Sequence, residues 1–289
     1  MIIEAVIQPF AEFGFMRRAL VGCLAISLGA TPVGVFLMLR RMSLTGDAMS
    51  HAILPGAAIG YLIAGLSLGA MTLGGLIAGM LVALVSAFIS RATAAGEDAS
   101  LAALYLISLA LGVLIVSTRG SNVDLMHVLF GTVLALDDGA LVLLCSIASL
   151  SVITVAVLFR PLVLECADPQ FLRSVSRLSA LTHFTFLTLV VLNLVGGFHA
   201  LGTLMAVGIM ILPAAAGRFW VSSPGALVGI AVLIAMLSSM SGLLLSYHYS
   251  FPSGPAIILV AGLFYTLSLV IGPFGGVLPQ MIPRKHLKA

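Results

Sequence analysis

A series of long apolar stretches, separated by short polar connections, constrains this chain more than any other sequence feature. A helix needs about 20 apolar residues to cross the hydrocarbon core of a membrane, and these stretches have that length. Only 8% of the residues are charged, against roughly 25% in soluble domains. Because so few charges cannot keep a protein surface hydrated, we expect lipid to cover most of the chain.

The sequence therefore predicts an all-α polytopic membrane protein with eight to nine transmembrane helices. The apolar stretches lie, to within a few residues, at 19–39, 43–65, 69–90, 100–117, 139–159, 180–195, 199–216, 224–246 and 255–271. Pro32, Pro55 and Pro213 lie inside three of them, and we expect each proline to break its helix because proline lacks the backbone N–H. The glycine pairs Gly65/Gly69, Gly75/Gly79 and Gly225/Gly229 have the spacing of close helix packing.

We expect a single transmembrane domain over residues 1–289, with three distinct segments within it. Residues 1–18 are predicted as an interfacial helix, residues 167–177 as a short cytoplasmic helix, and residues 279–289 as a basic cytoplasmic tail. Ten of the 13 Lys and Arg residues fall on one side of the predicted topology. The positive-inside rule places that side, with the C-terminus, in the cytoplasm.

Several classes of function are excluded by what the sequence lacks. The lysines are Lys285 and Lys288, so there is no phosphate-binding loop of the form GxxxxGK[ST]. Any ATP that drives this protein is therefore hydrolysed on another chain. Cys23, Cys145 and Cys166 are scattered, which argues against a disulfide framework or a structural zinc site. The small net charge of +3 gives no indication of nucleic-acid binding.

The segment RRMSLTGDAMSHAILPG, residues 40–56, places two ionisable side chains inside an apolar stretch. Asp47 and His51 are four residues apart, so they lie on one face of a helix, one turn apart. Ionisable groups at membrane depth are costly, and they mark ion or proton pathways. Asp47 is the only carboxylate deep inside a predicted span, whereas Glu165 falls in a predicted loop and His183 looks interfacial.

Two neighbours strengthen the interpretation of Asp47 and His51 as a metal site. Pro55 has no N–H to bond the carbonyl of His51, and Ser50 adds a hydroxyl. A carboxylate, an imidazole and a free carbonyl suit a divalent ion such as zinc or manganese. The alternative is that Asp47 and His51 only bind each other and hold two helices together.

Two further histidines lie near the predicted outer face. His199 opens the seventh apolar stretch, and His248 lies in the connection between the eighth and the ninth. They could form a polar mouth that passes or gates the ion, or they could be ordinary residues of interfacial turns. Both interpretations stay open on the sequence alone.

The predicted cytoplasmic helix reads ADPQFLRSVSR. Asp168 and Pro169 suit the N-cap and first helical position, and Phe171 belongs to an apolar face that is followed by Arg173. Such a helix either lies on the membrane surface or docks into a partner protein.

The run at residues 40–56 resembles the signature of the zinc/manganese-type ABC importer permeases, and residues 120–131, 201–218 and 251–270 resemble later stretches of that family. The resemblance covers nearly the whole chain. It implies a homodimeric permease in the bacterial inner membrane, with a cytoplasmic ATPase, an extracytoplasmic metal-binding protein and no tightly bound cofactor. It also implies that Asp47 and His51 coordinate the transported metal and that the stretch around Asp168 is the coupling helix. His199 departs from the family's pattern.

Two other functions are alternatives to a metal importer permease. An ion-gradient-coupled secondary transporter is expected to show inverted repeats, and no clear internal repeat is visible. An intramembrane metalloenzyme needs a third protein ligand and a general base, and the sequence has no HExxH motif.

Overall fold

The computed structural model describes residues 2–65, 67–93, 97–118, 133–168, 171–172 and 178–281. Every regular element in these ranges is a helix. The helices are α1 (Ile2–Glu12), α2 (Gly14–Leu39), α3 (Ser43–Ala52), α4 (Leu54–Ala64), α5 (Leu68–Ala92), α6 (Glu97–Thr118), η1 (Val133–Ala135), α8 (Asp138–Val157), α9 (Phe159–Ala167), α11 (Leu178–Leu201), α12 (Thr203–Gly217), α13 (Pro224–Tyr249), α14 (Ser253–Ile271) and α15 (Val277–Met281).

Seven of the described helices, α2, α5, α6, α8, α11, α13 and α14, are long and apolar enough to cross a membrane. The predicted all-α membrane fold is confirmed. The count of eight to nine spans stays a prediction, because α12 has only 15 residues and the stretch at 43–65 is divided into two short helices, α3 and α4.

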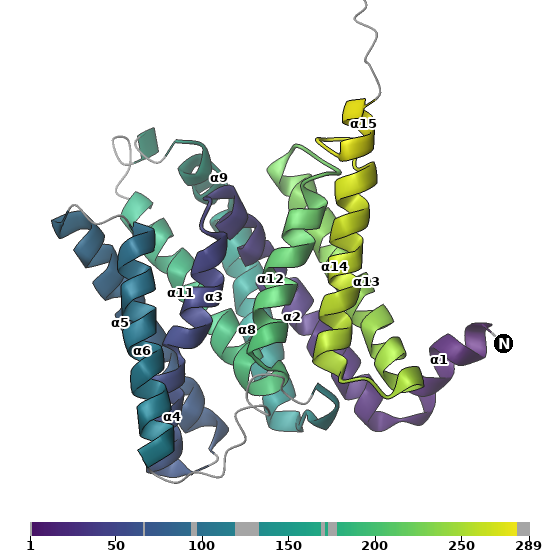
Figure 1. Cartoon of the computed structure of the whole chain (residues 1–289), viewed down its shortest axis with the longest axis horizontal. Coiled ribbons are helices and arrows are strands. Elements are labelled where there is room, and N and C mark those ends of the chain that lie inside the picture. Colours follow the sequence, from purple (N-terminus) through teal and green to yellow (C-terminus); the bar gives the residue numbers. More distant parts are fainter. Residues whose placement is uncertain are drawn as a thin grey trace, which may run out of the picture.

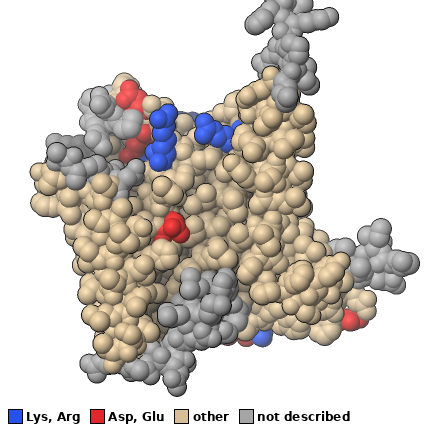
Figure 2. All heavy atoms as spheres, in the orientation of Figure 1, with Lys and Arg blue, Asp and Glu red and all other residues tan. Residues whose placement is uncertain are grey.

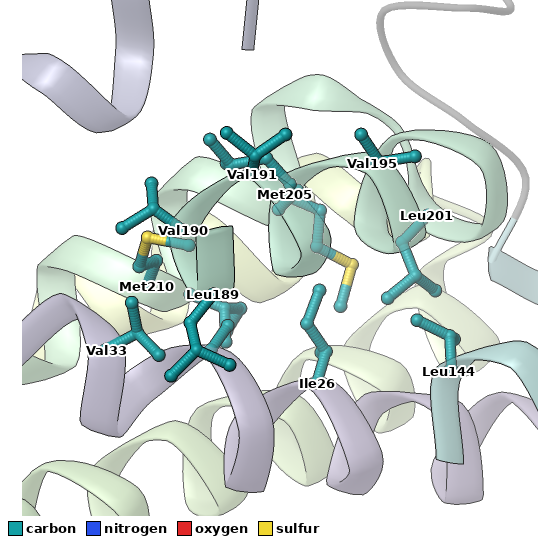
Figure 3. Close-up of a cluster of buried hydrophobic side chains, with 14 of the residues drawn as sticks. Ile26, Val33, Leu144, Leu189, Val190, Val191, Val195, Leu201, Met205 and Met210 are labelled. Atoms are coloured by element: carbon teal, nitrogen blue, oxygen red, sulfur yellow. The ribbon is translucent and has the colours of Figure 1, made fainter. Parts of the chain in front are cut away.

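The helices form one bundle in which α2, α8, α11 and α12 lie between an edge made by α4, α5 and α6 and an edge made by α13 and α14 (Figure 1). Side chains from α2, α8, α11 and α12 meet in the apolar core (Figure 3). Met205 and Met210 of α12 are fully buried there, with Ile26 and Val33 of α2. Of the seven long apolar helices, α2 and α11 are the most deeply buried.

The predicted breaks at Pro32 and Pro213 are wrong, because α2 and α12 continue through them. A neighbouring helix compensates for one missing N–H. The carbonyl of Ile209, four residues before Pro213, accepts a hydrogen bond from the buried Thr31 hydroxyl of α2, at 3.2 Å. Of these three prolines, only Pro55 lies next to a break, at Ile53 between α3 and α4.

The predicted start of a helix at His199 is also wrong. Helix α11 continues through Gly196 and Gly197 to Leu201, and the turn lies at Gly202, which has φ +88°. Glycine adopts this left-handed conformation without the clash that a Cβ would cause. The glycine pair at 196–197 serves helix packing instead, since Gly197 faces Ala206 of α12.

Helices α4 and α5 cross closely, because a Cβ on Gly56 or Gly74 would overlap the backbone of the other glycine. Gly60 packs in the same way against Ala70. Of the glycine pairs expected from spacing, Gly75/Gly79 does pack against neighbouring side chains, whereas Gly65, Gly69 and Gly229 face open space. Helix α4, which follows the break, is therefore held rigidly against α5.

Basic side chains on the face shown in Figure 2 gather along one end of the bundle, near α9 and the ends of α3 and α12. We call this the basic end; it carries Arg40 and Arg41 after α2, Arg160 in α9 and Arg218 after α12. The opposite end carries Arg17 and Arg18 in the first turns of α2.

Candidate metal pathway site

Helix α3 carries the two predicted metal-site residues on a face that the described residues leave uncovered. Leu44, Asp47 and His51 follow at helical spacing, and their side chains point out of the bundle: Leu44 is 84% exposed, and the Asp47 and His51 side chains are 65% and 30% exposed. The other side of α3 is buried against α6, α11 and α12. Figure 2 shows the resulting acidic patch, isolated in the middle of an uncharged face over α3.

Asp47 and His51 lie close together but are not hydrogen-bonded to each other. The distance between Asp47 Oδ1 and His51 Nε2 is 4.0 Å, beyond the range of a hydrogen bond. Two metal–ligand bonds of about 2.1 Å can span this distance. The pair thus lies at the limit of an ion-pair contact, and its spacing also leaves room for an ion between the two side chains.

The break between α3 and α4 fixes the position of His51. Pro55 has no N–H that could donate to the His51 carbonyl. The backbone N–H of Ile53 donates to that carbonyl instead. Helix α6 supports the break from the side: Ser108 Oγ donates to the Ala52 carbonyl at 2.9 Å, and Gly112 gives room for Pro55. Helix α3, the first half of the broken helix, thus ends next to His51. Such breaks are expected where an ion pathway interrupts a helix.

Ser50 takes a different place from the one predicted. Its hydroxyl is buried and donates to the Asp47 carbonyl of its own helix at 2.7 Å. It stabilises the turn that carries Asp47, and it points away from the uncovered face on which Asp47 and His51 lie.

The two predicted gate histidines are not brought to this site by the described contacts. His248 lies in the last turn of α13, where its Nδ1 is 2.9 Å from the Leu244 carbonyl and its ring stands edge-on to Tyr247. Helix α13 packs mainly against α2, α12 and α14. His199 lies in the last turn of α11, and its side chain is outside the described residues.

Most of the predicted coupling helix at 167–177 also lies outside the described residues, including Pro169 and Arg173. The described part has the predicted N-cap geometry, because Asp168 Oδ1 accepts a hydrogen bond from the Phe171 amide at 2.9 Å. Phe171 is 53% exposed at the basic end, while Leu172 beside it is buried.

A second group of ionisable residues was missed by the sequence reasoning. Glu165 does not lie in an exposed loop; it is buried in the last turn of α9, where its Oε2 accepts from Arg40 Nη2 at 2.8 Å. His183 of α11 completes this group. The apolar residues on both sides of Glu165, Leu164 and Cys166, were the available signal for burial.

Among the described residues, no three His, Cys, Asp or Glu side chains come together in a way that could hold a metal ion. As a metal site, Asp47 and His51 would therefore be incomplete, with two of the three or four protein ligands that such a site uses. Any further ligands have to come from outside the described part of one chain.

A bundle of apolar helices with an ionisable pair on a broken helix defines a multi-pass membrane protein of the transporter class. The model of the ABC 3 transport family matches residues 12–272, and the chain belongs to this family. Proteins of this kind are permease subunits of ABC transporters and not enzymes, since ATP is hydrolysed on a separate subunit.

Relatives and a solved structure agree with this assignment over nearly the full length. The manganese import system permease protein ScaB of Streptococcus parasanguinis is 30% identical over 272 residues, covering 94% of this chain and 96% of the relative. The manganese transport system membrane protein MntC of Halalkalibacterium halodurans is 30% identical over 278 residues, 96% of this chain and 94% of the relative. The structure of PsaBC from Streptococcus pneumoniae in complex with Fab matches with a TM-score of 0.85 and 28% identity, over 97% of this chain and 99% of that one.

Proposed function

We propose that this chain is the membrane-spanning subunit of an ATP-driven importer of a divalent transition metal ion, and that the ion passes the Asp47/His51 pair. The observation that carries the proposal is the exposed carboxylate–imidazole pair, whose acidic member stands alone among uncharged described side chains in the middle of this face (Figure 2). A charged aspartate in the centre of a membrane helix costs about 2.5–3.5 kcal/mol on insertion scales. A cation pathway gives a reason for that cost.

A second copy of the chain would cover this face and complete the site. Two copies related by a two-fold axis would bring two carboxylates and two imidazoles together, enough donors for a divalent metal. It would also remove Asp47 and His51 from lipid. The proposed working unit is therefore a homodimer in which the α3 helices face each other.

Manganese and zinc both remain candidates for the transported ion. Carboxylate and imidazole ligands suit either metal. The two relatives described above are named as manganese permeases, which makes Mn²⁺ the first ion to test.

The described region groups no third candidate ligand with Asp47 and His51, and the family is not enzymatic, which argues against an intramembrane metalloenzyme. Membership of an ABC family argues against an ion-gradient-coupled transporter.

In this proposal the basic end faces the cytoplasm of a bacterial cell, with the C-terminus on the same side. A cytoplasmic ATPase would dock there, on the segment that includes Asp168 and Phe171. An extracytoplasmic binding protein would deliver the ion to the opposite end, where His248 lies. The ion binds at the Asp47 level tightly enough to replace its water and weakly enough to be released.

The test uses the complete complex in proteoliposomes, with Mn²⁺ or Zn²⁺ uptake and ATP hydrolysis measured together. We expect Asp47→Ala to abolish uptake while assembly and basal ATP hydrolysis remain. Wild-type uptake by this variant would remove the site assignment.

Cross-linking tests the proposed dimer face. In a chain without its native cysteines, we expect Leu44→Cys to cross-link two copies with a short bifunctional reagent. Leu259→Cys is the matched control, because Leu259 is 74% exposed on α14, at the other side of the bundle. Equal cross-linking of the two variants would contradict the proposed face.

A further inference from the structure

A buried ionic cluster of Arg40, Glu165 and His183 lies at the basic end. The side chains of Arg40 and Glu165 are only 7% and 6% exposed, and their atoms Nη2 and Oε2 are 2.8 Å apart. The Arg40 guanidinium also lies 4.2 Å from the centre of the Phe186 ring of α11. An exposed ion pair contributes little, but removing one partner of a buried pair leaves an uncompensated charge.

The cluster connects three parts of the chain that have to move together in the proposed transport cycle. Arg40 is the residue that ends α2, three positions before α3, which carries Asp47. Glu165 lies three positions before Asp168, and His183 lies in the first two turns of α11. The buried ionic cluster therefore connects α9 and α11, the described helices before and after residues 167–177, to the turn that leads into α3.

The turn between Arg40 and α3 is too tight to absorb much movement. Met42 N–H bonds the Leu37 carbonyl at 2.9 Å and Arg41 N–H bonds the Met38 carbonyl at 3.0 Å, with Arg41 at φ 60°. This is a Schellman motif with an arginine in the position that usually holds glycine. A displacement of Arg40 is thus passed on to the start of α3.

The cluster also has two arrangements available. His183 Nδ1 lies 3.3 Å from Arg40 Nη1 and 3.6 Å from Glu165 Oε1. A guanidinium can only donate, so the neutral ring accepts from Arg40, whereas a ring protonated at Nδ1 pairs with Glu165. Arg40 Nε is buried without a hydrogen-bond partner among the described groups. A network that is only partly satisfied can be rearranged more easily than one in which every group is paired.

We propose that the buried ionic cluster of Arg40, Glu165 and His183 couples the coupling helix to the metal site. When the ATPase moves residues 167–177, Glu165 and His183 carry Arg40 with them, and Arg40 moves α3 and the Asp47/His51 pair. The three residues are positioning residues: they touch neither the ion nor ATP. The inference rests on the proposed function.

The experiment measures three quantities on the complete reconstituted complex: Mn²⁺ moved per ATP hydrolysed, the ATPase rate, and Mn²⁺ binding to the permease. For Glu165→Gln we expect the Mn²⁺/ATP ratio to fall about tenfold or more, in the range of a typical coupling free energy. The ATPase rate and Mn²⁺ binding should stay within about twofold of wild type, because neither site is touched. Asp138→Asn is the matched control, since Asp138 pairs with Arg18 at 3.1 Å on the exposed opposite end; its ratio should not change.

A second variant decides the matter if Glu165→Gln fails to assemble. Arg40→Lys keeps the positive charge but loses the fork that reaches Glu165 and His183 at once, and we expect it to lower the ratio too. A wild-type ratio in an assembled Glu165→Gln complex, or in Arg40→Lys where Glu165→Gln does not assemble, overturns the proposal. Failure of the proposed function would look different: the wild-type complex would move no Mn²⁺, or Asp47→Ala would retain Mn²⁺ binding.

Discussion

The crossing of α4 and α5 gives the sharpest prediction of stability, because it comes with a control on the same helix. A Cβ on Gly74 would overlap the carbonyl oxygen of Gly56 and lie 3.5 Å from the Gly60 nitrogen, whereas Gly69 has open space around it. Overpacking in a dense interior costs about 1–3 kcal/mol. Replacing an unhindered helical glycine by alanine contributes about 0.5–1 kcal/mol of stability. Both variants gain this contribution, so it cancels, and Gly74→Ala should be less stable than Gly69→Ala by the overpacking cost, about 1–3 kcal/mol.

The assay is reversible unfolding by SDS in mixed micelles, followed by the far-ultraviolet circular dichroism of the helices. Since α4 begins at the break next to His51, Gly74→Ala should also reduce metal uptake by the complete complex, and Gly69→Ala should not. Equal free energies of unfolding for the two variants would refute the reasoning, because they would mean that the backbones do not approach as closely as the structure shows.

Two further predictions follow from side-chain contacts. Thr31→Val removes the hydroxyl that donates to the Ile209 carbonyl and should lower the free energy of unfolding by about 0.5–2 kcal/mol. The loss should be smaller in a Pro213→Ala background, because alanine restores the N–H that proline lacks. Equal losses in both backgrounds would contradict this prediction. Burial raises the pKa of the Cys166 thiol above its ordinary value, although neighbouring Arg40 acts in the opposite direction. The thiol is therefore protonated at neutral pH, and maleimide should label it slowly in a chain whose other cysteines are alanine. The labelling rate should rise about tenfold per pH unit up to that pKa, because only the thiolate reacts. A labelling rate independent of pH would contradict the raised pKa.

The sequence was sufficient for the fold class because its signal is compositional. Apolar stretches of membrane length and the scarcity of charge predict a helical bundle in lipid, whatever the packing. Helix ends were harder to place. Proline at positions 32 and 213 was expected to break helices, but such a break depends on whether a neighbour supplies a donor, as Thr31 does, and the identity of neighbours is a tertiary property. The turn at Gly202 was missed for a similar reason, since the glycines at 196 and 197 are used for packing.

The candidate site shows the same division. The four-residue spacing of Asp47 and His51 predicts a shared helix face, and the structure places both on one face. Spacing could not predict which face of α3 the described residues leave uncovered, because that depends on the six helices that contact α3. Glu165 was misplaced because a carboxylate between predicted spans was assumed to be hydrated, and its partner Arg40 lies 125 residues away in the sequence.

The central claim is that the transported ion binds Asp47 and His51, and pulsed electron paramagnetic resonance of Mn²⁺ bound to the permease tests it most directly. We expect coupling of the manganese electron spin to imidazole nitrogen, and we expect His51→Ala to remove this coupling while the helical fold is retained. Nitrogen coupling that persists in His51→Ala, or its absence from a wild-type permease that binds and imports manganese, would contradict the account.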